Sequence, residues 1–383
     1  MVSIAFTGGG TGGHVYPGLA IISKLKESMS CRVFWIGCGT GMERAIVENE
    51  GLEFFGIPAG KLRRYFSLRN FIDAFKILAG FFAALRVLKR ERPELLFSKG
   101  GFVSVPPCAA AKFLKIPVFT HESDYSPGLA TKINTHFAEK IFIPYKESET
   151  FFPDAVKEKL RVSGNPIRSE FASADPSKGR AFLSLDDDER ILLVLGGSQG
   201  SREINKLVRS SLPQLIRYYT VVHQTGEDEV SDPGGVIFQN QIERYKPYAY
   251  FKNEIPHIIA AAELVLCRSG AGTIWECKSL GKPMVLIPFR GSGTRGDQVE
   301  NSRLFEKAGA AICLGTENTA DNEANGIDPA ELSALVISLA EDPQRRKAMG
   351  EAKIAESNAA AFIAEEISLR MKKNSEEKHY AGD

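Results

Sequence analysis

The sequence predicts an α/β protein built from two Rossmann-like domains, each a doubly wound parallel sheet. Short apolar runs rich in β-branched residues alternate with helical patterns along both halves, as in parallel sheets. Each half also opens in the same way, with a buried strand followed by a glycine-rich loop and a helix. The strands are Val2–Phe6, before GGGTGG, and Ile191–Leu195, before GGSQGS. At 383 residues the chain is long for one core and suits two domains.

Strand patterns recur at regular intervals in both halves. In the first half they are expected at residues 2–7, 32–37, 53–57, 94–98, 116–120 and 140–143. The pattern breaks around residues 162–166, which we interpret as a hinge. It restarts with strands expected at 191–195, 219–222, 235–238, 248–251, 264–267, 284–287 and 310–314. We therefore expect domains at 1–164 and 165–344, with a helix at about 345–371 packing back on the first domain.

Composition excludes several classes of protein. A hydrophobic content of 43% and a charged content of 25% are ordinary for a globular chain, and a net charge of +1 argues against bulk nucleic-acid binding. The six cysteines are scattered without a C-x-x-C pair, so structural zinc is not expected. No basic segment precedes the first apolar run, which argues against a signal peptide. The most apolar run, Ile77–Leu85, is shorter than the ~20 residues of a spanning helix.

The first glycine loop is the arrangement that holds phosphates. Glycines let the backbone approach a ligand closely, and free N–H groups at a helix start attract negative charge. Gly8, Gly10 and Gly13 match the dinucleotide fingerprint, but the second strand ends in Gly37 without the expected acidic residue. An ordinary tight turn is the alternative. His14, at the end of the loop, favours a chemical role.

A second phosphate-binding pattern follows strand 264–267, in the segment CRSGAGTIWE. Ser269 and Thr273 add side-chain donors to the N–H groups of the expected helix. Glu276 is expected in the first turn, where it would accept hydrogen bonds from a ribose diol or merely balance the helix dipole. Trp275 either packs in the core or covers the base of a nucleotide. Further on, Asp297 and Gln298 have the side chains that read sugar hydroxyls.

Seven motifs in order resemble one family. They are GGGTGGHVYPGLA, GGFVSVPPCAAAK, IPVFTHES, GNPIR, LGGSQGSREIN, CRSGAGTIWE and DQVEN. Together they resemble the bacterial peptidoglycan N-acetylglucosaminyltransferases, which have the GT-B architecture of two Rossmann-like domains facing a cleft. The resemblance implies transfer of N-acetylglucosamine from UDP-N-acetylglucosamine to undecaprenyl-diphospho-N-acetylmuramoyl-pentapeptide, giving the disaccharide lipid precursor of peptidoglycan.

The resemblance also implies which residues bind the donor. Thr11, Gly12 and Gly13 would face it from the first domain, Arg168 would lie near the uridine diphosphate, and Lys252 in the stretch that contacts uracil. The remaining expected donor-site residues are Asp124, Ser198, Gln199, Ala271, Gly272, Thr273, Ile274, Trp275, Glu276, Asp297 and Gln298.

The chain departs from the family pattern at several positions. Where the family has the motif HEQN, this chain has His121-Glu122-Ser123-Asp124. Asp124 therefore brings a carboxylate to a position where an amide is usual. Phe102 replaces a tyrosine, and Asp297-Gln298 replaces a pair of glutamines. These changes affect individual contacts more than the expected reaction.

His14 is the expected general base. Forming a β-1,4 bond from an α-linked donor inverts the anomeric carbon, so the acceptor's 4-hydroxyl must lose a proton as it attacks. A histidine titrates near neutral pH, which suits this task. Glu122 is the second candidate, and a loop-stabilising hydrogen bond is the alternative role for His14. No D-x-D pair stands where a metal would bridge donor phosphates, so no metal and no tightly bound cofactor are expected.

Residues 61–90 combine eight basic residues with one acidic residue and many apolar ones. A surface of this kind is typical of proteins that insert apolar side chains among anionic lipid headgroups. The alternative is an amphipathic helix that packs its apolar stripe in the core, because it has the same periodicity. The expected membrane-facing residues are Phe71, Ile72, Phe75, Leu78, Phe81, Phe82, Arg86, Lys89 and Arg90. We therefore expect a peripheral protein on the cytoplasmic face of the bacterial inner membrane. Expected partners are the two substrates, an anionic membrane surface and other cell-wall synthesis proteins, but no nucleic acid.

Two other functions fit parts of the sequence. One is another GT-B enzyme that uses a UDP-sugar, such as a glycolipid synthase acting on a lipid acceptor or a UDP-N-acetylglucosamine epimerase. An epimerase needs further catalytic carboxylates facing the diphosphate, and no convincing set is present. The other is a nucleotide-binding protein without turnover, in which Asp124 and Phe102 mark lost activity.

Overall fold

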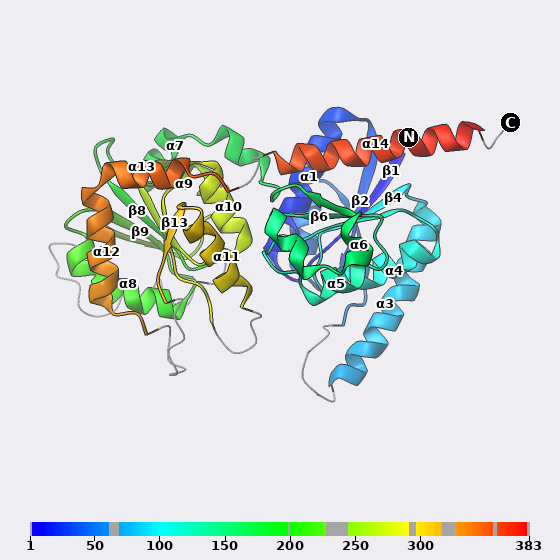
Figure 1. Cartoon of the computed structure of the whole chain (residues 1–383), viewed down its shortest axis with the longest axis horizontal. Coiled ribbons are helices and arrows are strands. Elements are labelled where there is room, and N and C mark those ends of the chain that lie inside the picture. The colour runs from blue at the N-terminus through cyan, green and yellow to red at the C-terminus, as the bar shows by residue number, and fades with distance from the viewer. Residues whose placement is uncertain are drawn as a thin grey trace. The chain divides into compact units, whose positions relative to one another are not determined.

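The computed structural model describes residues 2–60, 69–197, 200–226, 244–290, 296–315, 326–354 and 358–380, with only the backbone described for 69–72 and 375–380 (Figure 1). The chain divides into two compact units. Unit 1 comprises Met1–Arg168 and Ala355–Asp383, and unit 2 comprises Ser169–Ile354. Each unit is a parallel α/β structure, which confirms the predicted fold class.

Within its described residues, unit 1 contains a seven-stranded parallel sheet in the order β3-β2-β1-β4-β5-β6-β7. The strands are β1 (Val2–Thr7), β2 (Cys31–Cys38), β3 (Glu53–Ile57), β4 (Leu95–Ser98), β5 (Val118–His121), β6 (Lys140–Ile143) and β7 (Leu160–Val162). The α-helices are α1 (Tyr16–Ser28), α2 (Glu43–Asn49), α3 (Arg69–Glu91), α4 (Val105–Phe113), α5 (Leu129–Asn134), α6 (Asp154–Lys157) and α14 (Ala359–Tyr380). The strand order reverses between β1 and β4, so ligands of such sheets bind at the carboxyl ends of these two strands.

In the described part of unit 2, six parallel strands follow the order β10-β9-β8-β11-β12-β13. They are β8 (Ile191–Leu195), β9 (Thr220–Gln224), β10 (Tyr245–Tyr248), β11 (Leu264–Cys267), β12 (Met284–Leu286) and β13 (Ala311–Cys313). The α-helices are α7 (Pro176–Leu183), α8 (Arg202–Leu215), α9 (Ile255–Ala261), α10 (Ala271–Ser279), α11 (Asp297–Lys307), α12 (Pro329–Glu341) and α13 (Pro343–Glu351). The order reverses between β8 and β11, which places the second glycine loop and the CRSGAG segment together.

Several strand predictions differ from the structure. The strand expected at 248–251 lies three residues earlier, as β10, and the one expected at 235–238 lies outside the described residues. The short edge strand β7 was not predicted, because three residues are too few to show an apolar pattern. Short 3₁₀-helices occur at Gly12–His14, Phe102–Ser104, Lys146–Phe151 and Ser169–Ser173.

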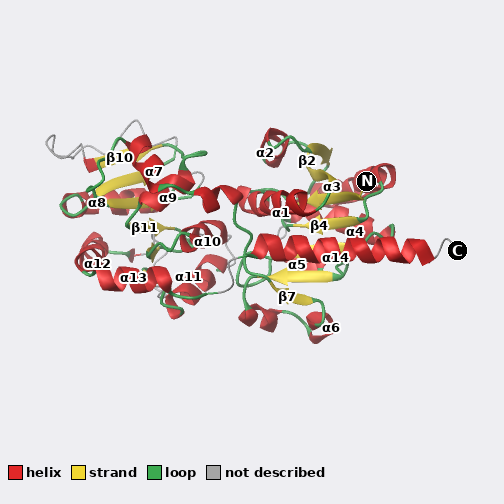
Figure 2. Ribbon diagram, turned by 90° about the horizontal axis from the view of Figure 1, so that it is seen from above, coloured by secondary structure: helices red, strands yellow, loops and turns green. Residues whose placement is uncertain are grey.

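The returning C-terminal segment begins later than the expected residue 345. Helix α13 belongs to unit 2, where the Lys278 ammonium donates to the Gly350 carbonyl. Helix α14 belongs to unit 1 and packs along α1, as Figure 2 shows. The division between the units falls after Arg168, four residues beyond the expected boundary.

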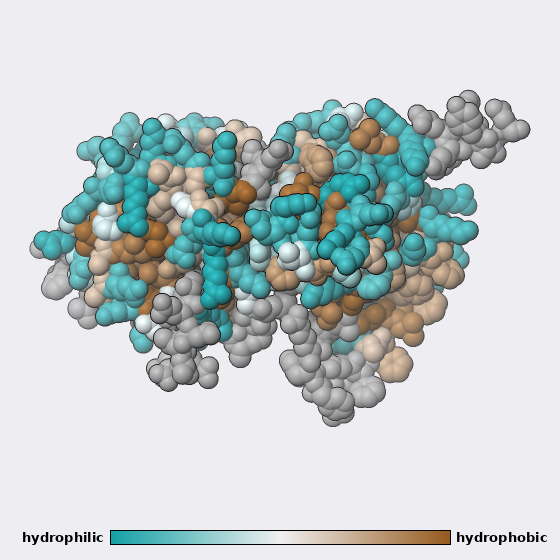
Figure 3. Space-filling view, viewed as in Figure 1, coloured by the Kyte–Doolittle hydropathy of each residue, from teal (hydrophilic) through white to brown (hydrophobic). Residues whose placement is uncertain are grey.

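Over its described side chains, helix α3 packs one face on the rest of unit 1 and leaves another exposed. Ala84 and Leu88 are buried against the sheet and α4, and Gly80 approaches so closely that a Cβ there would lie 2.4 Å from the Pro58 carbonyl. Large apolar side chains on α3 and α4 remain exposed, and they form brown surface at the lower right of Figure 3. The apolar residues of α3 therefore lie on both a packed face and an exposed face.

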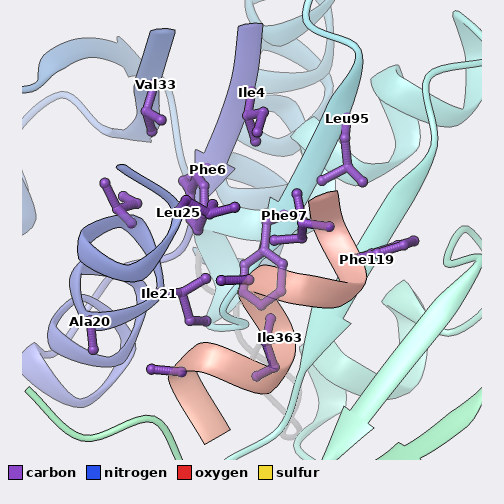
Figure 4. Packing of buried hydrophobic residues seen from close by; sticks show 14 of the residues in the cluster. Ile4, Phe6, Ala20, Ile21, Leu25, Val33, Leu95, Phe97, Phe119 and Ile363 are labelled. Atoms are coloured by element: carbon purple, nitrogen blue, oxygen red, sulfur yellow. The ribbon is translucent and has the colours of Figure 1, made fainter. Parts of the chain in front are cut away.

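The core of unit 1 lies on both faces of its sheet. Strand residues alternate, since Ile4 and Phe6 point toward α1 and α14 while Ala5 points toward α3 and α4. Figure 4 shows Ile363 of α14 beneath Phe97 in the first of these layers. Because α14 buries a full apolar stripe here, the last helix of the chain completes the first domain.

Candidate active site

The first glycine loop is held in place by a buried carboxylate. Glu43 of α2 is fully buried and accepts hydrogen bonds from the N–H groups of Cys38 (2.9 Å) and Gly10 (3.4 Å). A Cβ on Gly9 would lie 2.3 Å from the Glu43 Oε1 atom, so a larger residue there would displace the Glu43 side chain. Sequence reasoning missed Glu43, and the glycines that surround it (Gly37 to Gly41) are the signal that marks a close approach.

A second loop meets the first at the end of β4. Gly101 has a φ of 77°, and a Cβ there would lie 2.4 Å from the Gly9 carbonyl oxygen. The Phe102 ring packs against Gly10, where a Cβ would be 2.9 Å away. The hydroxyl expected from a tyrosine at this position is therefore absent beside the loop, while the ring keeps a packing role.

His14 is oriented by the backbone of the β4 loop. Its Nδ1 atom lies 3.2 Å from the Lys99 carbonyl oxygen, and the side chain is half-buried. A carbonyl oxygen only accepts hydrogen bonds, so this contact favours the tautomer with the proton on Nδ1. The Nε2 atom then carries the lone pair, which is the form that a general base needs. Thr11 and Gly13 beside it are exposed, and Gly12 is half-buried.

Glu122 is a different kind of carboxylate. It is buried and accepts four hydrogen bonds, from the N–H groups of Ser123, Asp124 and Gly128 and from the Thr131 hydroxyl, at 2.6–3.1 Å. Burial alone would raise the pKa of Glu122, but the hydrogen bonds from Thr131 and Gly128 outweigh it, and the pKa is lowered. The structure thus gives Glu122 the geometry of a loop anchor.

The segment GNPIR lies beside the Glu122 loop within unit 1. The Asn165 amide donates to the Ser123 carbonyl (2.8 Å), and His121 Nε2 lies 3.1 Å from the Gly164 carbonyl. Burial, together with the nearby Lys99 charge, lowers the pKa of His121 well below 6.5, so this ring is neutral. Arg168 then stacks its guanidinium 4.9 Å from the centre of the Tyr16 ring. Arg168 and the helix after the glycine loop therefore meet at one edge of the sheet.

In unit 2 an arginine joins the second glycine loop to the CRSGAG segment. Arg268 donates to the Ser201 hydroxyl (2.7 Å), and its guanidinium lies 4.4 Å from the centre of the Phe289 ring. Ser201 also caps α8 by accepting from the Ile204 N–H. Sequence reasoning did not single out Arg268, although an arginine directly after a buried strand is a signal of a site. The predicted phosphate contacts Ser198 and Gln199 lie outside the described residues.

The N-terminus of α10 is open. A Cβ on Gly270 or Gly272 would meet no atom of the described residues within 4 Å, and Thr273 of the first turn is half-buried. The buried Ser269 hydroxyl finds no hydrogen-bond partner among the residues that the structure describes. Ala271 begins the helix, so its first N–H groups have no partner within the helix. This end of the helix has the character of an anion site.

Two expectations about α10 need correction. The helix begins at Ala271, so Glu276 lies in the second turn and not the first, and a role in balancing the dipole loses its basis. The side chains of Ile274 and Trp275 are 0% and 3% exposed, and Trp275 packs on Phe305. Both belong to the core, because their positions on the helix face the sheet. Glu276 is half-buried.

The other predicted donor residues of unit 2 follow β10 (Lys252) and β12 (Asp297 and Gln298). Gln298 accepts a hydrogen bond from the Phe289 N–H (3.0 Å) through its side-chain oxygen, so that atom already holds the loop after β12. Asp297 is the first residue of α11. Lys252 is exposed and its N–H donates to the Glu254 carboxylate (3.1 Å), which shapes the turn that follows β10.

The described ranges, 2–60 through 358–380 with their gaps, lack two features. They hold no group of three or more His, Cys, Asp or Glu side chains placed to bind a metal ion. They also hold no helix of the length and apolarity that crossing a membrane requires.

Comparison with known proteins identifies the family. Residues 4–143 match the glycosyltransferase family 28 N-terminal domain, and residues 191–367 match the C-terminal domain. A UDP-N-acetylglucosamine–N-acetylmuramyl-(pentapeptide) pyrophosphoryl-undecaprenol N-acetylglucosamine transferase of Treponema denticola is 48% identical over 83% of this chain and 85% of its own. The enzyme of the same name from Clostridium perfringens is 40% identical over 82% of this chain and 85% of its own.

A solved structure agrees at the level of the fold. The crystal structure of MurG from Acinetobacter baumannii superposes with a TM-score of 0.73 over 96% of this chain and 100% of that chain, at 23% identity. The family models cover both units, and the matched residues include both glycine loops and the α10 segment. This chain belongs to glycosyltransferase family 28.

Proposed function

We propose that this chain transfers N-acetylglucosamine from UDP-N-acetylglucosamine to the 4-hydroxyl of undecaprenyl-diphospho-N-acetylmuramoyl-pentapeptide, with inversion at the anomeric carbon. The observation that carries the proposal is the full-length similarity to relatives named for that transfer. The two glycine loops and the open N-terminus of α10 support it, because the donor is a diphosphate.

The reaction needs a base for the acceptor and positive charge for the leaving UDP. His14 accepts the proton of the attacking hydroxyl at Nε2, since its Nδ1 is directed at the Lys99 carbonyl. In unit 2 the first N–H groups of α10 bind the diphosphate, and Glu276 accepts from the ribose. Arg168 adds a cation from unit 1. With these groups available we expect turnover without a divalent metal or a bound cofactor, so EDTA should leave the rate unchanged and a requirement for Mg²⁺ would contradict this.

The direct test incubates the protein with labelled UDP-N-acetylglucosamine and the lipid-linked muramoyl-pentapeptide. We expect a labelled disaccharide lipid and UDP, with the product lost in His14→Ala and kept in the control His136→Ala, which changes an exposed histidine. Label transferred to a different lipid acceptor would point to another transferase of this fold. Conversion of the donor without any acceptor would point to an epimerase, and no turnover at all to a binding protein.

We further propose that α3 and α4 dock unit 1 on the anionic cytoplasmic face of the bacterial inner membrane, as a peripheral protein. Phe75, Leu78 and Phe82 of α3 are 73%, 54% and 57% exposed, and Phe113 of α4 is 68% exposed. Phe81 joins them, since its ring contacts those of Phe82 and Phe113 at 5.4 and 6.3 Å between centres. Apolar groups of this size are rarely left in water without a partner surface.

Cations flank this apolar surface. Arg86, Lys89 and Arg90 are exposed on the last turns of α3, although Arg90 also pairs with Glu91. Each basic residue near anionic lipid contributes ~1 kcal/mol, and salt weakens the attraction. The side chains of the predicted membrane residues Phe71 and Ile72 lie outside the described set.

Vesicle sedimentation tests the docking surface. Phe75→Ser with Phe82→Ser, or Arg86→Glu with Lys89→Glu, should reduce binding to phosphatidylglycerol vesicles, while turnover of a short-chain, water-soluble acceptor persists. Leu369→Ser is the matched control, because Leu369 is 51% exposed on α14 of the same unit. Unchanged sedimentation of both double variants at low salt would show that this surface does not dock the protein.

A further inference from the structure

The tautomer of the His14 ring depends on the direction in which the Lys99 carbonyl group points. The distance from His14 Nδ1 to that carbonyl oxygen is 3.2 Å, and the contact favours the form with its lone pair on Nε2. Lys99 begins the loop of residues 99–104, which follows β4 and ends in the 3₁₀-helix Phe102–Ser104. The residues that hold this loop therefore also influence the histidine.

Asn134, the last residue of α5, donates hydrogen bonds to serines on both sides of the loop. Its Nδ2 atom lies 3.1 Å from the Ser98 hydroxyl and 2.8 Å from the Ser104 hydroxyl. An amide nitrogen carries two protons, so both of its donors are used. All three side chains are 0% exposed, and these hydrogen bonds are therefore shielded from water.

Each serine hydroxyl in turn holds the backbone of the loop. The Ser98 hydroxyl accepts from the Gly100 N–H at 3.2 Å, and the Ser104 hydroxyl donates to the Gly101 carbonyl at 2.8 Å. The Gly100 N–H belongs to the same planar peptide group as the Lys99 carbonyl. The hydrogen bond at Ser98 therefore fixes the plane in which the Lys99 carbonyl points.

Close packing surrounds this peptide group. A Cβ on Gly101 would lie 2.4 Å from the Gly9 carbonyl oxygen and 3.2 Å from the Cδ2 atom of His14. The Lys99 side chain is 1% exposed, and its ammonium donates to the Ser123 hydroxyl at 2.6 Å. A rotation of the peptide group would disturb these contacts, so the loop has one well-defined position against the histidine.

We infer that Asn134 is a positioning residue for His14. Through Ser98 it fixes the peptide group between Lys99 and Gly100, and thereby selects the His14 tautomer that can accept a proton. Asn134 lies in none of the seven motifs, so the family pattern does not identify it. The inference rests on the proposed function only for the role of His14 as the base.

A kinetic comparison tests this role. Asn134→Leu removes both donors and keeps a side chain of similar size. It should reduce kcat about tenfold or more, because the lone pair is no longer held at Nε2, while UDP affinity in calorimetry stays within about twofold. Thr135→Val is the matched control, since Thr135 is also buried and its hydroxyl donates to the Lys132 carbonyl of α5 at 2.7 Å. This control should lose stability but keep kcat within about twofold.

Heteronuclear NMR of the protein labelled at its histidine nitrogens reads the tautomer without substrate. At mildly alkaline pH the His14 signals, assigned by their loss in His14→Ala, should show the proton on Nδ1 in the parent protein. In Asn134→Leu they should shift toward the form protonated on Nε2. Ser98→Ala removes the same link to the peptide group and should give the same shift, which keeps the test open if Asn134→Leu does not fold.

Two results would overturn the inference. One is a parent-like tautomer in both Asn134→Leu and Ser98→Ala, and the other is a loss of kcat in Asn134→Leu no larger than in Thr135→Val. If the parent protein shows no turnover of UDP-N-acetylglucosamine but the tautomer still shifts in Asn134→Leu, the proposed function fails and the positioning role of Asn134 stands.

Discussion

Replacing Glu122 by glutamine separates a loop anchor from a general base. The Glu122 carboxylate accepts two N–H groups at one oxygen, from Ser123 and Asp124, and the Gly128 N–H and Thr131 hydroxyl at the other. Glutamine keeps one acceptor oxygen and replaces the other by an amide group. The Thr131 hydroxyl can turn and accept from that amide, but the Gly128 N–H faces another donor.

The loss of stability follows from the number of hydrogen bonds that glutamine cannot accept. One buried N–H loses its acceptor, which costs ~1–3 kcal/mol, and the remaining bonds lose the strength that a charged acceptor gives them. We expect Glu122→Gln to lower the free energy of unfolding of unit 1 by about 3 kcal/mol. A loss of proton transfer would instead reduce kcat by ~10²–10⁴-fold with little change in stability.

The assay uses the two tryptophans of the chain. Trp35 lies in the core of unit 1 and Trp275 in the core of unit 2, so a Trp275→Phe background makes fluorescence report urea unfolding of unit 1. Glu147→Gln, an exposed glutamate of the same unit, is the control and should stay within ~0.5 kcal/mol. Unchanged unfolding combined with a large loss of kcat would refute the anchor and return Glu122 to the role of base.

Three further predictions concern His14, Glu276 and Lys99. His14→Ala should lower kcat by ~10²–10⁴-fold while UDP affinity, measured by calorimetry, stays near that of the parent protein; near-normal kcat would assign the proton to another group. Glu276→Ala should weaken UDP binding by roughly 1.5–3 kcal/mol, because a ribose diol loses a charged acceptor, and unchanged affinity would exclude a ribose contact. For Lys99 the folded pKa of about 8 lies below the ordinary 10.5, so the folded protein holds fewer protons than the unfolded one between these values. The stability of the parent protein should therefore rise with pH across this window, relative to Lys99→Met, by roughly 3 kcal/mol, and parallel pH curves for the two proteins would contradict the buried ammonium.

Much of the architecture can be predicted from local sequence patterns. A buried strand, a glycine loop and a helix are consecutive in the chain, so the two halves and their parallel sheets are visible without tertiary contacts. The motifs that identify the family are local for the same reason. His14 is found this way, because its place at the end of the loop is a matter of sequence alone.

The roles of single side chains were decided by tertiary contacts. Glu43, Lys99 and Arg268 matter because strands far apart in the sequence end at one edge of a parallel sheet, and no pattern reports which loops then touch. Trp275 was open between core and site until the helix face was known. On α3 the same apolar pattern includes Leu88, which is buried, and Phe82, which is exposed. The pattern shows that a residue is apolar, but it does not show which other residues cover it.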